Sequence, residues 1–500
     1  MPTRHKDRLS SVDASFLHQE GHASHMHVGA VMIFEGPPPA REDFLAQIDS
    51  RLHLVPRYRQ KVAFPRFEMG RPLWIDDPSF NLEYHVRHTA LPSPGGVEQL
   101  RQLAGRIYSQ GLDRSKPLWE VWLVQGLEPA EAGSRGSRGA HEHTTGGGRF
   151  ALINKTHHAL VDGVSGVDLA TVLFDVSPVP AKLGKLDNNW TAAPEPTQAE
   201  LIAEGVKGAV RTPLEVAGSL LKAVSQPGTT LRAAREAAEG VGEILWAGLN
   251  PAPETPLNVP IGPHRRVWWV RSSLADFKAI KNEVGGTVND VVLAVVSGAL
   301  GRWLRTRGVR TEGLELRALV PVSIRSEGTE SELGNQIAAM RAPLPVYATD
   351  PLDRLTIVKE SMADLKQSKQ ALGAEVISGL NDFAPPTLLA QASRLNFSTR
   401  LFNMIVTNVP GPQFPLYLLG RELQELAPIA FLPQDHALAV AIMSYNGCVD
   451  FGLLGDYDAM PDLDVFADYL DDALAELMEA AGAGRPAKRA RETGGTPARA

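Results

Sequence analysis

Hydrophobic residues in the first third of the chain recur at every second position in some stretches and at helical spacing in others. Alternation is typical of strands, and a period near 3.6 is typical of helices. The pattern predicts strands over residues 27–35, 82–91, 119–127 and 149–157. It predicts helices over residues 41–53 and 97–110, between those strands. We therefore expect an α/β unit at the start of the chain.

The next segment has a different composition. Regular structure is broken by the prolines Pro178, Pro180, Pro194 and Pro196. Residues 198–248 are rich in alanine and helical in tendency, and a Pro-rich stretch follows over residues 250–263. This composition indicates a connector long enough to cross a second domain.

Alternating strand and helix patterns return in the second half. Strands are predicted over residues 265–271, 314–322, 335–344, 402–409 and 415–431. Helices are predicted over residues 274–283, 287–306, 351–372 and 462–480. The pair Asn446-Gly447, between the runs 437–445 and 448–454, predicts a β-hairpin, because both residues tolerate the positive φ angles of a tight turn.

These patterns divide the chain into four parts. Residues 1–185 and 264–482 are predicted to form two α/β domains, joined by the helical and Pro-rich connector 186–263. Residues 483–500 carry Lys and Arg among Gly, Ala and Pro, and are predicted to be a disordered basic tail. A chain of 500 residues is long enough for this division.

Composition excludes several classes of protein. A net charge of −7 gives no overall attraction to nucleic acid or to an anionic membrane surface. The single cysteine, Cys448, rules out an intrachain disulfide framework and a Cys-rich metal site. The first 30 residues have no apolar core of a secretory signal, and no window approaches the ~20 apolar residues that span a bilayer. We expect a cytoplasmic protein that at most rests on the inner face of a membrane or on a lipid inclusion.

The most informative segment is His157-His158-Ala159-Leu160-Val161-Asp162-Gly163, which follows the apolar run Phe150 to Ile153 and precedes a helix-like stretch. Adjacent side chains point in different directions, so one imidazole is expected to face a substrate and the other to be held by the protein. An unprotonated imidazole in a cleft accepts a proton from a hydroxyl. The alternative for any single histidine is a packed or surface residue.

The pattern His-His-x-x-x-Asp-Gly after an apolar strand resembles the active-site motif of the CoA-dependent acyltransferase superfamily. Other segments resemble one branch of it, the bacterial wax ester synthase/acyl-CoA:diacylglycerol acyltransferase (WS/DGAT) family. These segments are residues 9–17, Met26-His27-Val28, Pro117-Leu118-Trp119-Glu120, residues 287–292, residues 321–325, Gly334-Asn335-Gln336 and residues 408–412. The Gly/His/Arg-rich stretch 129–148 departs from the family pattern and is interpreted as an insertion.

The resemblance implies a fold and a reaction. It implies two chloramphenicol-acetyltransferase-like α/β (α+β) domains with mixed sheets and an active-site tunnel at their interface. It implies an O-acyltransferase that moves a long-chain acyl group from acyl-CoA to diacylglycerol or a long-chain alcohol, without an acyl-enzyme. No cofactor or metal is expected, acyl-CoA being a substrate. The partners expected are the two lipid substrates and a membrane or lipid-droplet surface, with no nucleic acid.

The resemblance also assigns residues. His158 is the general base, His157 its neighbour and Asp162 the acid that supports the turn, with Arg325 as its predicted partner. Contacts with substrate are predicted for Gly163, Trp119, Asp290 and Gln336.

Asn289 is predicted to hold the oxyanion or orient the acceptor. Thr287-Val288-Asn289-Asp290 fits a capping box before an apolar run, which places Asn289 in the first turn of a helix, where unpaired N–H groups favour negative charge. The alternative is that Asn289 and Asp290 only cap that helix. For Arg325, the alternative is an exposed residue with no partner.

Other interpretations stay open at this point. The histidines His18, His22, His25 and His27 invite a metal site, but their spacing matches no common zinc pattern. Trp119 is alternatively a core residue. For function, the alternatives are a condensation-type acyltransferase that uses a carrier protein, and a non-catalytic lipid-binding protein that keeps the fold.

Overall fold

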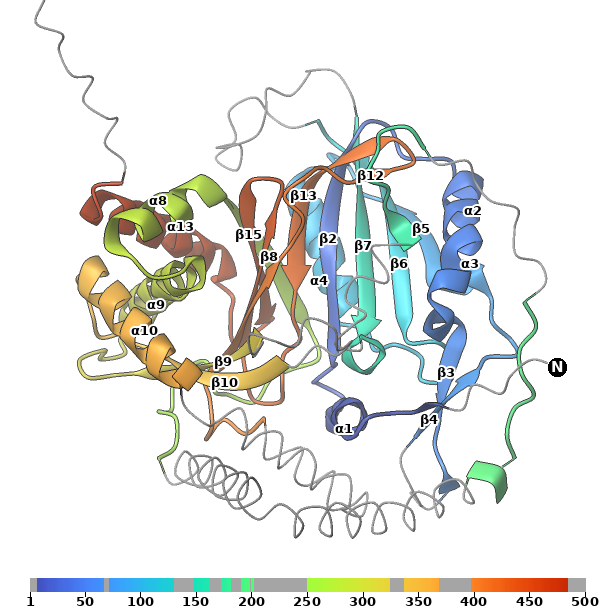
Figure 1. Ribbon diagram of the computed structural model, residues 1–500, viewed down its shortest axis with the longest axis horizontal. Helices are drawn as coiled ribbons and strands as arrows, with labels where there is room; N and C mark the ends of the chain where they lie inside the picture. The colour runs from blue at the N-terminus through green and yellow to red at the C-terminus, as the bar shows by residue number, and fades with distance from the viewer. Residues whose placement is uncertain are drawn as a thin grey trace, which may run out of the picture.

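The computed structural model describes residues 7–66, 72–129, 148–161, 172–180, 190–197, 199–201, 250–323, 337–367 and 397–483. Its main elements are two six-stranded sheets that lie side by side, each with helices on its outer face, together with a small three-stranded sheet (Figure 1). Both large sheets are mixed, so the predicted fold class is confirmed.

The N-terminal sheet has the strand order β12-β13-β2-β7-β6-β5. Its centre is formed by β2 (His27–Glu35), β7 (Arg149–His157) and β6 (Trp119–Leu127), which pair antiparallel, while β5 (Val86–Ala90) is parallel to β6. Around this sheet lie helices α1 (Ser11–Gln19), α2 (Arg41–Arg51), α3 (Leu82–His85) and α4 (Val97–Tyr108) and the short 3₁₀ turns Leu52–Leu54 and Pro56–Arg59. The three-stranded sheet contains β1 (Asp7–Arg8), β4 (Leu73–Asp76) and β3 (Gln60–Ala63).

The other edge of this N-terminal sheet comes from the far end of the chain. Strand β13 (Arg421–Ile429) pairs antiparallel with β2, from Leu423 opposite Phe34 to Ile429 opposite Gly29, and β12 (Tyr417–Leu418) follows it at the edge. The run predicted as one strand over residues 415–431 is therefore two strands in the first sheet. Chain segments about 400 positions apart in the sequence are adjacent there.

The C-terminal sheet has the order β10-β9-β11-β14-β15-β8. Its strands are β8 (Arg265–Ser273), β9 (Leu316–Ser323), β10 (Ile337–Leu344), β11 (Met404–Pro410), β14 (Leu438–Tyr445) and β15 (Cys448–Asp456). Its outer face is covered by helices α8 (Leu274–Val284), α9 (Val288–Thr306), α10 (Pro351–Gln367) and α13 (Leu463–Ala480) (Figure 1). The hairpin predicted at Asn446-Gly447 joins β14 to β15, and both residues have positive φ angles.

Three hydrophobic clusters fix the layers. One lies between the C-terminal sheet and its helices, and a second lies on the outer face of the N-terminal sheet. The third lies between the sheets and is built from inward residues of both, such as Val31 and Ile153 on one side and Val267 and Ala439 on the other, together with α4. Burial of this apolar middle layer holds the halves together.

The sheets approach closely where β13 passes β15. A Cβ atom added to Gly452 of β15 would lie 1.6 Å from the carbonyl oxygen of Pro428 in β13. No side chain fits at that distance, so only glycine permits this contact between the two sheets.

Sequence-based boundaries agree with most of the predicted elements, and two predicted strands differ: the run 415–431, which is two strands, and the run 82–91. The predicted strand 82–91 begins as the helix α3, capped by the Asn81 side chain, and becomes a strand only at Val86. Predictions for the insertion, most of the connector and the C-terminal tail lie outside the described residues, and the proposed domain boundaries stay predictions.

Among the described residues, no single helix is long and apolar enough to cross a bilayer. Helices α8 and α9 pass that test only as a pair, and they are bent by 102° at their junction.

Candidate active site

The two adjacent histidines lie where β7 ends. His157 is the last residue of the strand, and residues His158–Leu160 form a 3₁₀ turn directly after it. The backbone N–H of His157 donates to the carbonyl of Leu118 at 3.0 Å, and that of His158 donates to the carbonyl of Met26 at 2.7 Å. Two neighbouring segments therefore fix the backbone of both residues.

The His158 ring is enclosed by phenylalanines from different parts of the chain. Phe16 of α1 stacks on it with ring centroids 4.0 Å apart and an angle of 26° between the planes. Phe431, which follows β13, meets it edge-on at 5.4 Å, and Phe397 contacts both phenylalanines at about 6 Å. Since α1 belongs to the first half of the chain and Phe397 and Phe431 to the second, the ring lies where the halves meet.

This environment keeps the His158 imidazole neutral. Burial lowers its pKa to about 4, and the residue's own carbonyl group acts weakly in the opposite direction. Its Nδ1 atom is buried with no hydrogen-bond partner among the described residues, and the residue as a whole is half-buried. An imidazole in this state is able to accept a proton near neutral pH.

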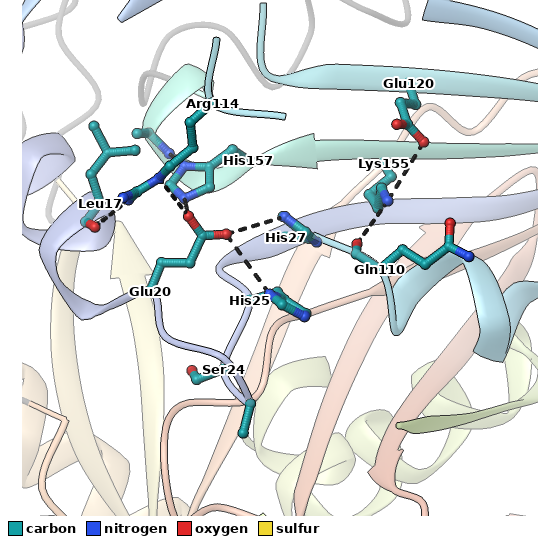
Figure 2. A network of polar contacts seen from close by, with 12 residues as sticks. Leu17, Glu20, Ser24, His25, His27, Gln110, Arg114, Glu120, Lys155 and His157 are labelled. Carbon is teal, nitrogen blue, oxygen red and sulfur yellow. Dashed lines mark hydrogen bonds and ion pairs between the residues drawn. The ribbon is translucent and has the colours of Figure 1, made fainter. Parts of the chain in front are cut away.

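The ring of His157 lies in a polar cluster around Glu20 (Figure 2). Its Nδ1 atom accepts a hydrogen bond from the backbone N–H of Ala159 at 3.0 Å, so the ring proton belongs on Nε2. Nε2 lies 3.7 Å from Oε2 of Glu20. Burial lowers the pKa of His157 to about 3, although the Glu20 carboxylate opposes this shift.

Glu20 is the centre of that cluster. Arg114 approaches its Oε2 atom with Nε at 2.9 Å, and the Nε2 atom of His27 lies 3.5 Å from Oε1 (Figure 2). His25 approaches the same oxygen at 3.9 Å. Two of the four histidines that invited a metal interpretation, His25 and His27, thus face a carboxylate. The described residues contain no group of three or more potential ligands that could hold a metal ion.

Helix α1 contributes to both histidines at once. Ser10 caps its N-terminus by accepting from the N–H of Asp13 at 3.0 Å, and Glu20 ends it with its N–H donating to the carbonyl of Phe16. Phe16 lies in the last two turns of α1, and Glu20, four positions later, is the residue that caps its C-terminus. The two side chains therefore project from the same side.

The predicted capping box is present at the start of α9. The N–H of Asp290 donates to Oγ1 of Thr287 at 3.2 Å, and the N–H of Thr287 donates to Oδ2 of Asp290 at 2.7 Å. Asp290 is buried with Oδ1 unpartnered among the described residues. Asn289 lies in the first turn, as predicted, and its Oδ1 accepts from Nδ2 of Asn408 at 3.1 Å. No contact between described residues joins Asn289 to His158.

Trp119 is a buried residue of the outer core of the N-terminal sheet, with 1% of its surface exposed. Its Nε1 donates to the carbonyl of Tyr58 at 2.8 Å, and its ring stacks on His85 at 4.7 Å. This packing favours the core interpretation. The segment Pro117-Leu118-Trp119-Glu120 contributes to the site in another way, because the carbonyl of Leu118 accepts the hydrogen bond from the N–H of His157.

Four predicted site residues lie outside the described residues: Asp162, Gly163, Arg325 and Gln336. Their roles stay predictions.

Phe16, Glu20, Arg114 and Phe431 were not predicted as site residues. For the first two the sequence held a signal, namely their spacing of one helical turn. Phe16 lies inside the segment 9–17, which was quoted only for its resemblance, and Glu20 follows that segment. For Arg114 and Phe431 it held none, since both reach the site through tertiary packing.

A cavity of about 1330 Å³ lies elsewhere, between β8, α8 and α13. Its wall includes Arg271, Asp276, Asp468 and Glu479 but none of the site residues. The histidines and phenylalanines of the candidate site do not line this cavity, so it takes no part in the proposed chemistry at His158.

The chain is similar to known proteins along most of its length. It is 31% identical over 476 residues to a Mycobacterium tuberculosis protein named probable diacylglycerol O-acyltransferase tgs1, covering 94% of this chain and 96% of that protein. The structure of a wax ester synthase/diacylglycerol acyltransferase from Marinobacter aquaeolei VT8 superposes with a TM-score of 0.62 at 29% identity, covering 95% of this chain and 100% of that one.

A more distant structure shares the fold alone. The starter condensation domain of a rhizomide synthetase has a TM-score of 0.54 at 13% identity, covering 95% of this chain and 94% of that one.

The family's own sequence models cover both halves. The wax ester synthase/diacylglycerol acyltransferase catalytic domain matches residues 9–132 and 145–292, and the WS/DGAT C-terminal domain matches residues 333–478. The break in the first match falls inside the stretch interpreted as an insertion. With both domains matched in order around a neutral histidine at the end of a buried strand, the chain belongs to the WS/DGAT family and is an acyltransferase.

Proposed function

We propose that this acyltransferase moves a long-chain acyl group from acyl-CoA to the hydroxyl group of diacylglycerol or of a long-chain alcohol, with His158 as the general base. The observation that carries the proposal is the neutral, aromatic-walled imidazole of His158 at the meeting point of the two halves. A base in such a place typically contributes about 10²–10⁴ in rate.

The base role requires one particular tautomer of the neutral ring. In this proposal the proton is on Nδ1 of His158 and the lone pair is on Nε2. Nε2 takes the proton of the acceptor hydroxyl as its oxygen attacks the thioester carbonyl. When the tetrahedral intermediate collapses, the C–S bond breaks and the same proton passes to the sulfur of CoA. No acyl-enzyme forms in this sequence, and it requires no metal.

The developing oxyanion needs a donor. Asn289 and the free N–H groups in the first turn of α9 are our candidates, because the N-terminus of a helix favours negative charge. In the same proposal Asp162 and Arg325 support the turn after His158, Gly163 provides its bend, and Gln336 contacts a substrate.

The substrates explain the apolar surroundings. Each methylene group taken out of water contributes about 0.8 kcal/mol, so a passage walled by residues such as Phe16 and Phe431 favours long acyl and alkyl chains. We place such a passage between the two domains. Both acceptors dissolve in membranes or lipid inclusions rather than in water, so we also propose that the enzyme works at such a surface.

The test is a purified-enzyme assay with palmitoyl-CoA and either dioleoylglycerol or hexadecanol, following CoA release and the neutral-lipid product. We expect product with both thioester and acceptor present, and a loss of at least about a hundredfold in kcat for His158→Ala. A loss below about tenfold in this variant would remove His158 from the base role.

The same assay separates the other functions. A requirement for an acyl carrier protein in place of CoA would support the condensation-type reaction. Binding of lipid without any turnover would support the non-catalytic protein. Flotation of the enzyme with liposomes that contain dioleoylglycerol tests surface association, and recovery only in the protein fraction would refute it.

A further inference from the structure

One helical turn of α1 touches both histidines of the motif. Phe16 stacks on the ring of His158, and Glu20 faces the ring of His157. The two histidines are neighbours at the end of β7 and their rings point in different directions, so a single rigid helix face fixes two separate rings. The contact made by Phe16 is aromatic, and the contact made by Glu20, the residue that caps α1, is electrostatic.

We propose that Glu20 is a positioning residue for the transfer reaction: its carboxylate, anchored by Arg114, holds the ring of His157 with the proton on Nε2, and through His157 it aligns the turn that carries His158. This inference rests on the proposed base role of His158. Glu20 touches neither substrate nor the reacting atoms in this scheme.

The first step of the argument concerns the ring of His157. A neutral imidazole has one donor nitrogen and one acceptor nitrogen. Nδ1 of His157 must be the acceptor, because the N–H of Ala159 points at it from 3.0 Å. That hydrogen bond closes the turn that contains His158. If the ring changed tautomer, its Nδ1–H would face the N–H of Ala159, and if it flipped, its Cδ2–H would face that N–H. In either case the hydrogen bond that closes the turn would be lost.

The second step concerns what selects this tautomer. Nε2 lies 3.7 Å from the Glu20 carboxylate, too long for a hydrogen bond but close enough for a strong electrostatic preference in a buried place. Only 10% of the Glu20 side chain is exposed, so the charge is little screened by water. Nε2 has no hydrogen-bond partner among the described residues, which leaves Glu20 as the group that favours its proton.

The third step concerns how Glu20 itself is fixed. Arg114 binds Oε2 through Nε at 2.9 Å and also donates to the carbonyl of Leu17 at the end of α1. His27 lies 3.5 Å from Oε1 and is directly opposite His157 in the pairing of β2 with β7 (Figure 2). The carboxylate is therefore held from helix, loop and strand, and is unable to rotate away from His157.

The experiment compares Glu20→Gln with a matched control. Gln keeps the size of the side chain and removes its charge. We expect kcat for palmitoyl-CoA and dioleoylglycerol to fall about ten- to a hundredfold, the range typical for loss of an orienting partner, with KM for both substrates within about twofold. Glu20→Asp keeps the charge, so its kcat should fall less than that of Glu20→Gln. If Glu20→Gln fails to fold, Glu20→Asp takes its place in the comparison.

The control is Asp175→Asn. Asp175 is also a carboxylate paired with one arginine, Arg51, and its side chain is 12% exposed, but it lies away from both histidines. We expect a decrease in Tm similar to that of Glu20→Gln, with kcat within about twofold of the wild type. Equal losses of kcat in the two variants would show a general effect of destabilisation and would overturn the proposal.

A double-mutant cycle tests the route through His157. His157→Asn keeps an oxygen where Nδ1 accepts from Ala159 and removes the nitrogen that faces Glu20. If Glu20 acts through that nitrogen, adding Glu20→Gln to His157→Asn should lower kcat by no more than about twofold further. A further loss as large as that of Glu20→Gln alone would contradict the proposal.

The variant His158→Ala distinguishes failure of the positioning role of Glu20 from failure of the proposed base role of His158. If His158→Ala abolishes turnover while Glu20→Gln keeps full kcat, only the positioning role fails. If His158→Ala keeps turnover within tenfold, the base assignment itself fails, whatever Glu20 does.

Discussion

The ring of Phe16 stacks on the imidazole of His158, with 4.0 Å between their centroids. This contact excludes water from one face of the imidazole and keeps the ring in one orientation. It also connects the first helix of the chain to the motif about 140 positions later. The dry environment that lowers the pKa of His158 is partly made by this single side chain.

Shortening Phe16 should therefore change the chemistry as well as the packing. For Phe16→Leu we expect a small loss of stability, on the order of 1 kcal/mol, because the volume change is modest. We also expect more CoA release in the absence of acceptor, since water gains access to the thioester. The control is Phe150→Leu, which disrupts the stacked pair Phe34–Phe150 far from the motif. Acceptor-free CoA release that is unchanged in Phe16→Leu would show that Phe16 does not exclude water.

The activity should be nearly independent of pH around neutrality. A histidine with an ordinary pKa of about 6.5 loses roughly three quarters of its neutral form at pH 6. Because burial lowers the pKa of His158 to about 4, its neutral form predominates at pH 8 and at pH 6 alike. We expect kcat/KM to stay within about twofold between these values. An acid limb with a midpoint near 6.5 would contradict the buried position of the base.

The stability of the fold should decrease as the pH falls below 7. His157 and His158 have pKa values of about 3 and about 4 in the folded protein, and that of His27 lies well below its ordinary value. Between pH 6.5 and those values the unfolded chain binds protons that the folded chain does not, so acid favours unfolding. Each such histidine contributes a slope of up to about 1.4 kcal/mol per pH unit.

Urea denaturation at pH 7, 6 and 5 measures this slope. The free energy of unfolding should fall with each step, and His27→Gln should reduce the slope relative to the wild type. A free energy that is constant from pH 7 to pH 5 would show that these histidines are protonated in the folded protein.

Asn289 and Asp290 lie next to each other in α9 and should behave differently. For Asn289→Ala we expect a fall in kcat larger than any rise in KM, because an oxyanion donor acts in the transition state. Asp290→Ala should instead cost about 1 kcal/mol of stability through the lost capping box. Asn408→Ala is the matched control for the hydrogen bond between the two asparagines. An unchanged kcat in Asn289→Ala would reduce Asn289 to a residue of the helix terminus.

The contact between the two sheets should tolerate no side chain at Gly452. The added methyl group of Gly452→Ala would overlap the carbonyl of Pro428, so the sheets must separate or the strands must shift. We expect a loss of about 1–3 kcal/mol or more in the free energy of unfolding. Gly148→Ala, where a Cβ atom meets nothing within 4 Å, should be neutral. Equal stability of the two variants would mean that β13 and β15 are not held this closely.

The sequence predicted the local elements well where alternation and caps agree. Strands β2, β6 and β7 have the predicted boundaries, and the hairpin at Asn446-Gly447 and the capping box of α9 are confirmed. The failure at residues 82–85 is local, because the Asn81 cap stabilises one helical turn at the start of an otherwise β-prone run. Such a short helix leaves no periodicity to detect.

The arrangement of the site could not be predicted in the same way. The His-His-x-x-x-Asp-Gly motif identified His157 and His158. The alternation of apolar and polar residues along β13 does not say to which of the two sheets this strand belongs. Phe431 therefore reaches His158 through a pairing between segments that are far apart in the sequence. The partners of Glu20 were hidden for a similar reason, since its charge contacts depend on how α1 packs against β2 and β7.

The pairing of β13 with β2 has a consequence for how the enzyme is made. A ribosome that has synthesised everything up to residue 420 has released β2, but the partner of its free edge, β13, has not yet emerged. The base also still lacks one aromatic wall, because Phe431 comes later. We therefore expect a chain that stops before this point to be inactive. In a series of ribosome-bound chains of increasing length, the first sheet should resist protease only once residues beyond 431 have left the exit tunnel. The reaction centre therefore assembles only late in synthesis, after most of the chain has been made.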